Sequence, residues 1–537
     1  MAYQKAERSL GEKIGQVIMA GFPETGLSDD FKRLIEEYKI GNVILFSHNV
    51  ESIPQLAALC GEIHNRIHEA TGIPPFIAMD QEGGVVSRLP REATSIPGAM
   101  AIAATGRPEN ARRLGEITAL ELSALGVNMN MAPVMDINSN KNNPVIGVRS
   151  YGDTHETVSS FGLQMLKGLQ AGGVLPVIKH FPGHGDTSVD SHLGLPMITK
   201  TEAELMQNEL VPFINAIREG APVVMTSHIL FPAIETEKVP ATLSGAVLTG
   251  LLKNRLGFEG LIVTDCLEMN AVKDYYGTAK GALEALKAGA HMVLVSHTAS
   301  LIEQTARTLK EAVLSGELPM KTLDKAVEKV TALKATLKGT LKGCTLKATL
   351  KAAPSGIKEK KKPLSSVGCV SHKKEAMSIM EESLTLAEGS LPGLSANTLF
   401  AGPPAYRATM ASSSVNREFN FPEYMARHLG GDSLLFPVNP SEEEADRLTR
   451  GLEKYETLVV ATYNGHLNQG QIALINRLCA MGKSVVAVAL RNPYDLGLIK
   501  GARAKLAVYE YTLPAFNSLI KVLSGELEPK GKLSVTL

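Results

Sequence analysis

Eight short apolar runs, separated by longer amphipathic stretches, occupy the first ~300 residues and constrain the fold more than any other feature of the sequence. The runs are GQVIMAGF, GNVILF, PFIAMD, VNMNMAPVMD, VLPVIKHF, PVVMTSH, LIVTD and HMVLVS. The stretches between them, such as TEAELMQNELVPFINAIREG from Thr201, have the periodicity of amphipathic helices. Strands that alternate with helices predict an α/β fold with a parallel sheet, and eight such units predict a closed TIM (β/α)8 barrel.

Charged or titratable residues close five of these apolar runs. They are Asp80, Asp136, Lys179 with His180, His228 and Asp265. Any one of them could merely begin a loop or cap the following helix. In a parallel barrel, however, the carboxyl ends of all strands meet at one rim, where the active sites of this fold are built. Five such positions in succession therefore predict a polar cavity at that rim.

The chain beyond the barrel divides into a linker and a second domain. From Leu333 the sequence LKATLKGTLKGCTLKATLK nearly repeats itself, and the Lys-rich segment PSGIKEKKKP follows. We interpret residues 333–365 as an interdomain linker, either flexible or a Leu-lined helix with a basic solvated face. Residues 1–332 then form the catalytic barrel. The runs LVVATYN, SVVAVAL and KLAVYEY, with the helix QIALINRLCAMGK, predict a smaller α/β (αβα) sandwich over residues 366–537.

Composition excludes several classes of function. Lys plus Arg and Asp plus Glu both number 55, so the chain lacks the positive field of a non-specific nucleic-acid binder. The charged N-terminus lacks a signal-peptide pattern and no run reaches about 18 uninterrupted apolar residues, so no membrane partner is expected. The five cysteines contain no C-x-x-C pair, which is typical of thiols in a reducing cytoplasm. We expect a cytoplasmic monomer or homodimer that binds a small ligand.

The densest cluster of reactive side chains is the segment KHFPGHGDTSVDSH, which runs from Lys179 to His192. Pro182 and the glycines that follow it exclude a helix, so the segment is expected to be a loop over the barrel rim. Asp190 and His192 lie two residues apart and would share one face of an extended segment. A carboxylate that binds one ring nitrogen raises the basicity of the imidazole, which then works as a general acid and base near neutral pH.

Two other interpretations of these residues stay open. Asp265 is the last residue of the apolar run LIVTD, and the chain turns directly after it. It is either a nucleophile or the N-cap of the following segment. The loop also contains residue types that bind zinc, although Pro and Gly separate its histidines and Lys179 adds an unfavourable positive charge. No metal site is therefore predicted. No organic cofactor is expected either, because the Gly pairs at Gly83 and Gly172 lack the G-x-G-x-x-G pattern.

Several motifs, in this order and spacing, resemble glycoside hydrolase family 3 in its β-N-acetylglucosaminidase branch. They are AMDQEGGVVSRL from Ala78, APVMDIN from Ala132, GVRSYGD from Gly147, KHFPGHGDTSVDSH from Lys179 and VTDCLEMNAV from Val263. RNPYDL from Arg491 and SGELEPKGKLSVTL from Ser524 resemble the second, sandwich domain of that family. The likeness covers nearly the whole chain except the Lys-rich linker.

The resemblance implies retaining hydrolysis of terminal, non-reducing β-linked N-acetylglucosamine from cell-wall (peptidoglycan) fragments or chito-oligosaccharides. It implies that Asp265 is the nucleophile and that His192, paired with Asp190, is the general acid and base. The positions that it assigns to holding the sugar are Asp80, Arg149, Lys179, His180 and His228. A histidine in place of a second carboxylic acid also makes an anionic acceptor easier to admit, and some members of this family are described as phosphorylases.

The sequence departs from the pattern of this family at two positions in the barrel. Cys266 fills the place after the nucleophile where an acid is usual, and His291 stands where an Asp is common. Three alternatives to a retaining glycoside hydrolase stay open. They are a phosphorylase that uses phosphate as acceptor, a metal-dependent barrel hydrolase, and a sugar-binding protein without catalysis. Asp265 and the pair Asp190 and His192 are intact, which favours the hydrolase over a binding protein.

Overall fold

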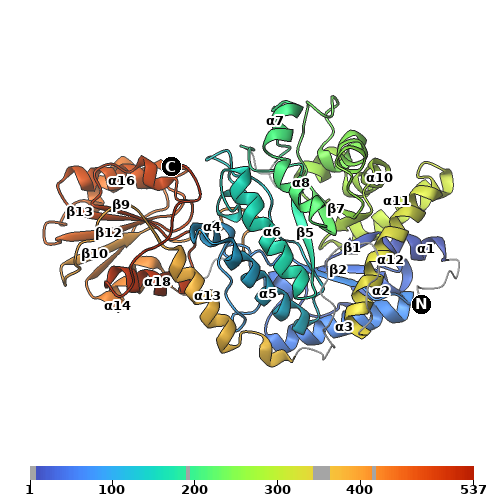
Figure 1. The fold of residues 1–537 in the computed structure, drawn as a ribbon, viewed down its shortest axis with the longest axis horizontal. Helices are drawn as coiled ribbons and strands as arrows, with labels where there is room; N and C mark the ends of the chain where they lie inside the picture. The colour runs from blue at the N-terminus through green and yellow to red at the C-terminus, as the bar shows by residue number, and fades with distance from the viewer. Residues whose placement is uncertain (1–7, 189–193, 343–362, 414–418) are drawn as a thin grey trace.

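The computed structural model describes residues 8–188, 194–342, 363–413 and 419–537, and everything said below of the structure concerns these ranges. The chain forms a large helix-wrapped barrel and a smaller sheet domain at one side of it (Figure 1). No helix in the described ranges is long and apolar enough to cross a membrane.

The barrel is a closed sheet of eight parallel strands, with β8 paired to β1. The strands are β1 (Ile18–Ala20), β2 (Asn42–Leu45), β3 (Phe76–Met79), β4 (Met129–Asn130), β5 (Leu175–Phe181), β6 (Val223–Thr226), β7 (Leu261–Cys266) and β8 (Met292–Val295). Each of the eight apolar runs contains one of these strands, so the predicted TIM barrel is confirmed. β4 is short because the Ala132 N–H turns back to the Asn130 carbonyl at 2.8 Å, although the Ala132 carbonyl still accepts from the Val177 N–H of β5 at 3.0 Å.

Helices cover the outside of the barrel. They are α1 (Leu10–Gln16), α2 (Asp29–Tyr38), α3 (Ile53–Thr71), α4 (Ala99–Ala104), α5 (Pro108–Leu125), α6 (His155–Ala171), α7 (Glu202–Gln207), α8 (Val211–Arg218), a π-helix (Ala246–Arg255), α9 (Asn270–Tyr276), α10 (Thr278–Ala288) and α11 (Ala299–Ser315). The amphipathic stretch from Thr201 is two helices instead of one. Pro212 explains the break, because its ring and its missing N–H cannot continue α7.

A further helix, α12 (Met320–Lys342), closes the amino end of the barrel. Val330 packs into the cluster of side chains that fills the barrel, with Leu333 and Leu337 against it. The Nζ of Lys334 donates hydrogen bonds to Gln16 Oε1 at 2.8 Å and to the Gly41 carbonyl at 2.9 Å. The first residues of the predicted linker are therefore part of a barrel helix, whereas residues 343–362 lie outside the described ranges.

The second domain is a six-stranded sheet in the order β11-β10-β12-β13-β14-β9, parallel except for the pair β14 and β9. Its strands are β9 (Thr385–Gly389), β10 (Thr398–Gly402), β11 (Asp432–Leu435), β12 (Thr457–Thr462), β13 (Ser484–Ala489) and β14 (Ala504–Ala507). Its helices are α13 (Val370–Ser383), α14 (Phe421–Leu429), α15 (Glu442–Leu448), α16 (Gln469–Ala480), α17 (Asp495–Leu498) and α18 (Leu513–Leu523). Figure 1 shows α16 above this sheet and α14 and α18 below it, so the predicted α/β sandwich is confirmed.

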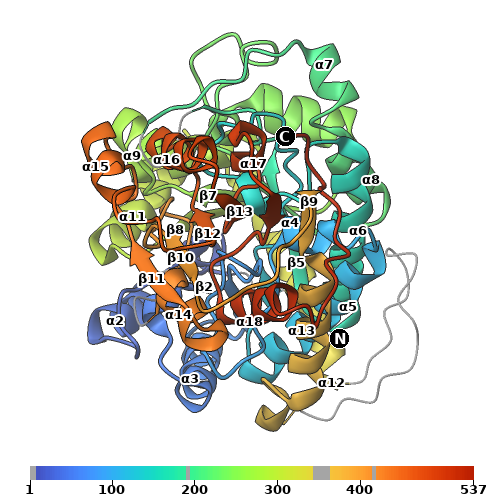
Figure 2. The same ribbon diagram turned by 90° about the vertical axis from the view of Figure 1, so that its left-hand side faces the viewer.

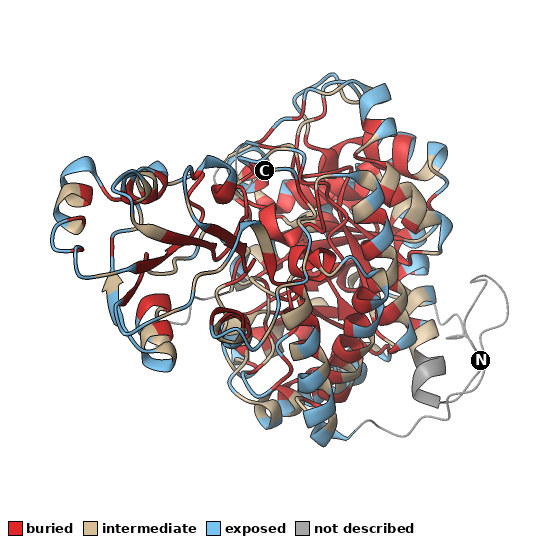
Figure 3. Cartoon of the chain, turned by 60° about the vertical axis from the view of Figure 1, so that its left-hand side comes forward, coloured by how far each residue is buried: buried red, intermediate tan, exposed pale blue. Residues whose placement is uncertain are grey.

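The two domains are in direct contact. Viewed from the side of the second domain, its sheet lies in front of the barrel (Figure 2). The C-terminal segment returns to the barrel, where the Lys532 N–H donates to the Ala104 carbonyl and the Thr536 N–H donates to Asp153. Buried residues fill both the barrel and the centre of the second sheet (Figure 3). Each domain therefore has a core of its own.

Candidate active site

The polar residues that close the apolar runs lie at the carboxyl ends of the strands. Asp80 follows β3, Lys179 and His180 lie near the end of β5, and Asp265 lies near the end of β7. Because the strands are parallel and form a closed barrel, these side chains belong to one rim. The barrel therefore brings together residues that are up to about 185 positions apart in the chain.

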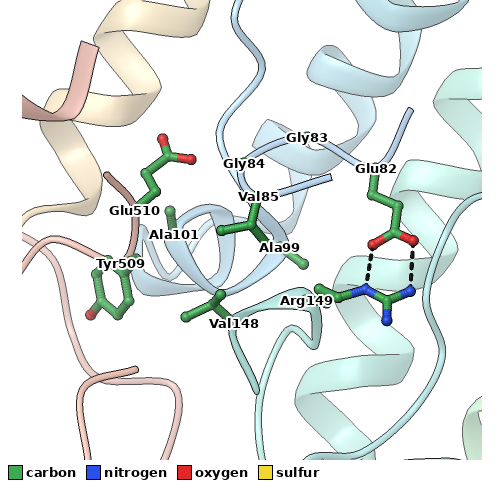
Figure 4. A pocket seen from close by; sticks show the side chains of 11 residues that line it. Glu82, Gly83, Gly84, Val85, Ala99, Ala101, Val148, Arg149, Tyr509 and Glu510 are labelled. Carbon is green, nitrogen blue, oxygen red and sulfur yellow. Dashed lines mark hydrogen bonds and ion pairs between the residues drawn. The ribbon is translucent and has the colours of Figure 1, made fainter. Parts of the chain in front are cut away.

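A buried network of four charges is the centre of this rim. The ammonium group of Lys179 lies 2.7 Å from Asp80 Oδ1 and 2.6 Å from Glu82 Oε1. Both oxygens of Glu82 in turn accept from the guanidinium of Arg149, at 2.8 and 2.9 Å, as Figure 4 shows. The two carboxylates are thus paired with the two cations, and three of the four side chains are less than 10% exposed.

Glu82 is a member of this network that the sequence analysis did not identify. Burial alone would raise the pKa of its carboxyl, but Arg149 and Lys179 outweigh that effect and hold the pKa well below its usual range. The sequence contained a signal for Glu82, which is the next acid after Asp80 in the same motif. Two cations at one buried site, Lys179 and Arg149, need a second carboxylate besides Asp80.

Asp136, which follows β4, orients the histidines of the next strand. Its Oδ2 lies 2.7 Å from Nδ1 of His180, and its Oδ1 accepts from the backbone N–H groups of His180 and His184. Burial would raise the pKa of Asp136, but the contact with His180 lowers it below its ordinary value. The Nε2 atom of His180 therefore faces Arg149, at 3.5 Å from its guanidinium, as part of the same polar cluster.

The surroundings of Asp265 fix its carboxylate at the end of β7. Its Oδ1 accepts from the N–H of Cys266 at 2.7 Å. The Nε2 of His228 lies 2.9 Å from the Cys266 carbonyl, and its Nδ1 lies 2.8 Å from Thr242 Oγ1. His228 thus contacts the backbone beside Asp265. Burial raises the pKa of the Cys266 thiol to about 11, so this side chain is a neutral partner of Ser296 at 2.9 Å.

Asp190 and His192, the predicted acid and base pair, lie outside the described residues. The beginning of their loop is described and is held against the segment that follows β4. The amide of Asn143 donates to the His184 carbonyl at 2.8 Å. A Cβ atom at Gly185 would collide with the Ile137 carbonyl, so only glycine allows this close approach.

The second domain holds both segments that carry the charge network. Asn138, after β4, donates to the Tyr494 hydroxyl at 2.7 Å and accepts from the N–H of Gly147 at 3.0 Å, two residues before Arg149. On the segment after β3, the guanidinium of Arg88 donates to the Ala411 carbonyl at 2.6 Å. Tyr494 belongs to the RNPYDL motif, so this motif lies at the interface between the domains.

A small cavity lies between these elements (Figure 4). Glu82 and Arg149 line one side of it, and Tyr509 and Glu510 of the second domain line the other. Glu510 is only 3% exposed, and this burial raises the pKa of its carboxyl to about 7. One oxygen of the carboxyl has no hydrogen-bond partner among the described residues. The interface therefore contains a carboxyl group that titrates near neutral pH.

Within the described ranges, no three His, Cys, Asp or Glu side chains are grouped so that they could hold a metal ion. The ionised groups of the rim are instead paired with one another. This arrangement suits a neutral, hydroxyl-rich ligand, whose hydroxyl groups can accept from Lys179 and Arg149 and donate to Asp80.

Comparisons with known proteins agree with this geometry. The family model "Glycosyl hydrolase family 3 N terminal domain" matches residues 9–333. The chain is 31% identical to beta-hexosaminidase A of Pseudoalteromonas piscicida, covering 96% of this chain and 92% of that protein. A beta-hexosaminidase of Thioalkalivibrio sulfidiphilus is 37% identical over 54% of this chain and 83% of its own.

One solved structure matches both domains. It is a glycoside hydrolase family 3 beta-N-acetylglucosaminidase from Paenibacillus sp. str. FPU-7, with a TM-score of 0.88 and 36% sequence identity over 99% of each chain. The similarity therefore extends through the barrel and the sandwich domain together.

Proposed function

Because the chain belongs to glycoside hydrolase family 3, we propose that it is an exo-acting β-N-acetylglucosaminidase that removes terminal, non-reducing N-acetylglucosamine from small oligosaccharides. Its relatives over the full length are a beta-hexosaminidase and a beta-N-acetylglucosaminidase, which supports this sugar. The substrates that we propose are peptidoglycan fragments or chito-oligosaccharides, and the partner is thus a small carbohydrate.

The observation that carries the proposal is the position of Asp265 on the same rim as the buried charge network. In a retaining mechanism the Asp265 carboxylate attacks the anomeric carbon, and the bond from that carbon to the leaving oxygen breaks. A covalent glycosyl-enzyme forms, which water then hydrolyses. The hydrogen bond from the Cys266 N–H to Oδ1 orients this carboxylate.

The leaving group needs a proton, and we assign this role to His192 with Asp190. His192 would protonate the departing oxygen and later take a proton from the attacking water, while the Asp190 carboxylate fixes its tautomer. This role follows from the motif in the sequence, which places the pair in the loop that leaves β5.

The charge network is proposed to hold the terminal sugar. Asp80, Lys179 and Arg149 offer one acceptor and two charged donors, and their mutual ion pairs fix each of them before a ligand arrives. His180, oriented by Asp136, adds Nε2 to this set. His228, whose Nε2 lies 2.9 Å from the Cys266 carbonyl beside Asp265, is proposed as a further residue that holds the sugar.

The proposal is tested with 4-nitrophenyl β-N-acetylglucosaminide and the matching β-glucoside, in buffer or phosphate and in the presence of EDTA. We expect release of 4-nitrophenol from the N-acetyl substrate. The Asp265→Asn variant should lose turnover and keep the ability to bind the sugar, whereas an unchanged rate would refute the nucleophile. A sugar 1-phosphate formed in phosphate would instead identify a phosphorylase, and activity that EDTA abolishes would identify a metal-dependent enzyme.

The role of His192 has a separate test. His192→Ala should slow hydrolysis of natural glycosides far more than that of the 4-nitrophenyl substrate, because a phenolate leaves without prior protonation. Equal losses on both substrates would refute the proton-transfer role and leave the assignment of Asp265 untouched.

A further inference from the structure

A lysine and a histidine are in contact at the amino end of the barrel strands, opposite to the active-site rim. His291 directly precedes β8, and Lys253 belongs to the π-helix Ala246–Arg255. The Nζ of Lys253 lies 3.0 Å from Nε2 of His291. His291 is 7% exposed, whereas Lys253 is only half-buried and remains within reach of solvent.

The hydrogen bonds of His291 determine which of the two groups carries a proton. The backbone N–H of Ile262 in β7 donates to Nδ1 of His291 at 3.0 Å, so Nδ1 is an acceptor without a proton. In a neutral imidazole the proton is then on Nε2, which faces Lys253 as a donor. An ammonium group has donors only, and two donors cannot form a hydrogen bond. As a hydrogen bond, this contact forms only with the neutral amine of Lys253, which then accepts from Nε2.

The charges around this amine act in the same direction. Burial, together with the smaller effect of the ammonium groups of Lys329 and Lys325 on α12, lowers the pKa of Lys253 to about 8. Burial also lowers the pKa of His291 to about 3, so the imidazole is neutral. On the helix of Lys253 itself, the nearby Arg255 is paired with Glu202. The amine is thus a nucleophile in cationic surroundings, which attract small anions.

We propose that Lys253 is a site of covalent N-acylation by small anionic acyl donors of the acyl phosphate class. The lone pair of Nζ attacks the carbonyl carbon of the donor, and an N–C bond forms. The bond from that carbon to the phosphate oxygen breaks, and one amine proton leaves with the phosphate as hydrogen phosphate. Lys325 and Lys329 would attract the phosphate group. The hydrogen bond from the Nε2–H of His291 favours the neutral form of Lys253, and it opens to free the lone pair of Nζ for attack.

The test uses the full chain and acetyl phosphate at a pH of about 7.5, with acetyl occupancy at each lysine followed over time by peptide mass spectrometry. Lys167 is a matched internal control, because it is also half-buried but is paired with Glu219 at 2.9 Å. With a pKa of about 8, about a quarter of Lys253 is neutral at this pH, against about a thousandth at the ordinary value of 10.5. A less basic amine is also a weaker nucleophile, so we expect acetylation at least about tenfold faster than at Lys167.

Two further measurements make the result decisive. In the unmodified protein the rate at Lys253 should level off above a pH of about 8. In His291→Asp, a carboxylate would pair with the ammonium form and reduce acetylation of residue 253 to the level of Lys167. Lys253→Arg should keep glycosidase activity, since this site lies opposite to the rim. Equal rates at Lys253 and Lys167, or no levelling of the Lys253 rate, would overturn the proposal even if His291→Asp did not fold.

Discussion

Replacement of Glu82 by Gln tests whether the charge network of the active site supports the fold as well as the ligand site. The substitution keeps the size of the side chain and removes one negative charge. In the wild type, Glu82 pairs with both Lys179 and Arg149, whereas in the variant Lys179 keeps Asp80 and Arg149 loses its carboxylate partner. The side chains of Lys179 and Arg149 are 3% and 4% exposed, so water cannot screen the excess charge.

The expected cost is large for a substitution that changes so little volume. Removal of one partner from a buried ion pair destabilises a protein by about 3–5 kcal/mol, because the remaining charge stays buried without compensation. Glu82 also accepts two parallel hydrogen bonds from Arg149, of which a neutral amide can accept only one. We therefore expect Glu82→Gln to lower the free energy of unfolding by about 3–5 kcal/mol and to weaken sugar binding through a displaced Arg149.

Guanidinium denaturation followed by circular dichroism measures this effect. Glu284→Gln is the matched control, because Glu284 pairs with Lys287 at 3.0 Å on the surface of α10, where both side chains are about one-third exposed. The control should cost less than about 0.5 kcal/mol. If Glu82→Gln cost no more than Glu284→Gln, the buried network would not stabilise the barrel and the reasoning would be refuted.

The pH dependence of the same variant supplies an independent check. Although burial alone would raise it, Arg149 and Lys179 hold the pKa of Glu82 below its ordinary value of 4.5. The stabilisation by Glu82 is then fully present above pH 4.5 and is lost as the pH falls below it toward the folded-state pKa. Wild type and Glu82→Gln should therefore differ most at neutral pH and converge on acidification.

Three other predictions concern the domain interface and the ligand site. Tyr494→Phe removes the hydroxyl that accepts from Asn138, so we expect KM to rise about fivefold with kcat nearly unchanged. Steady-state kinetics would detect this change, and a fall in kcat alone would contradict the positioning role. Because burial raises the pKa of Glu510 from 4.5 to about 7, the folded protein binds more protons than the unfolded chain between these values, so its stability should fall as the pH rises through this window. Glu510→Gln should remove this pH-dependent loss of stability and raise the free energy of unfolding at pH 8 by up to about 3 kcal/mol, as measured by thermal or chemical unfolding. If the variant and the wild type had the same pH profile of stability, the raised pKa of Glu510 would be excluded. Treatment with EDTA should leave glycosidase turnover unchanged, whereas recovery of lost activity on addition of zinc would reverse this expectation.

Several features of the fold could be predicted because they depend on local sequence. The eight apolar runs identify all eight barrel strands, since each run must be buried on both faces of a parallel sheet. The strands β12, β13 and β14 of the second domain were found in the same way. The split between α7 and α8 was missed, although Pro212 is a local signal for it. The strands β9, β10 and β11 were not identified either, and β9 and β11 are partly exposed edge strands with weaker apolar patterns.

The sequence by itself determined the barrel and the rim positions of Asp80, Lys179, His180 and Asp265, because strand order and direction place every strand end on one side. Only the tertiary structure decided which charges pair with one another. Glu82 between Lys179 and Arg149, and Tyr494 against Asn138, join segments that are about 67 to 356 positions apart, and no local periodicity encodes such contacts. They arise because a buried charge or polar group must find its partner in space, wherever the chain brings one close.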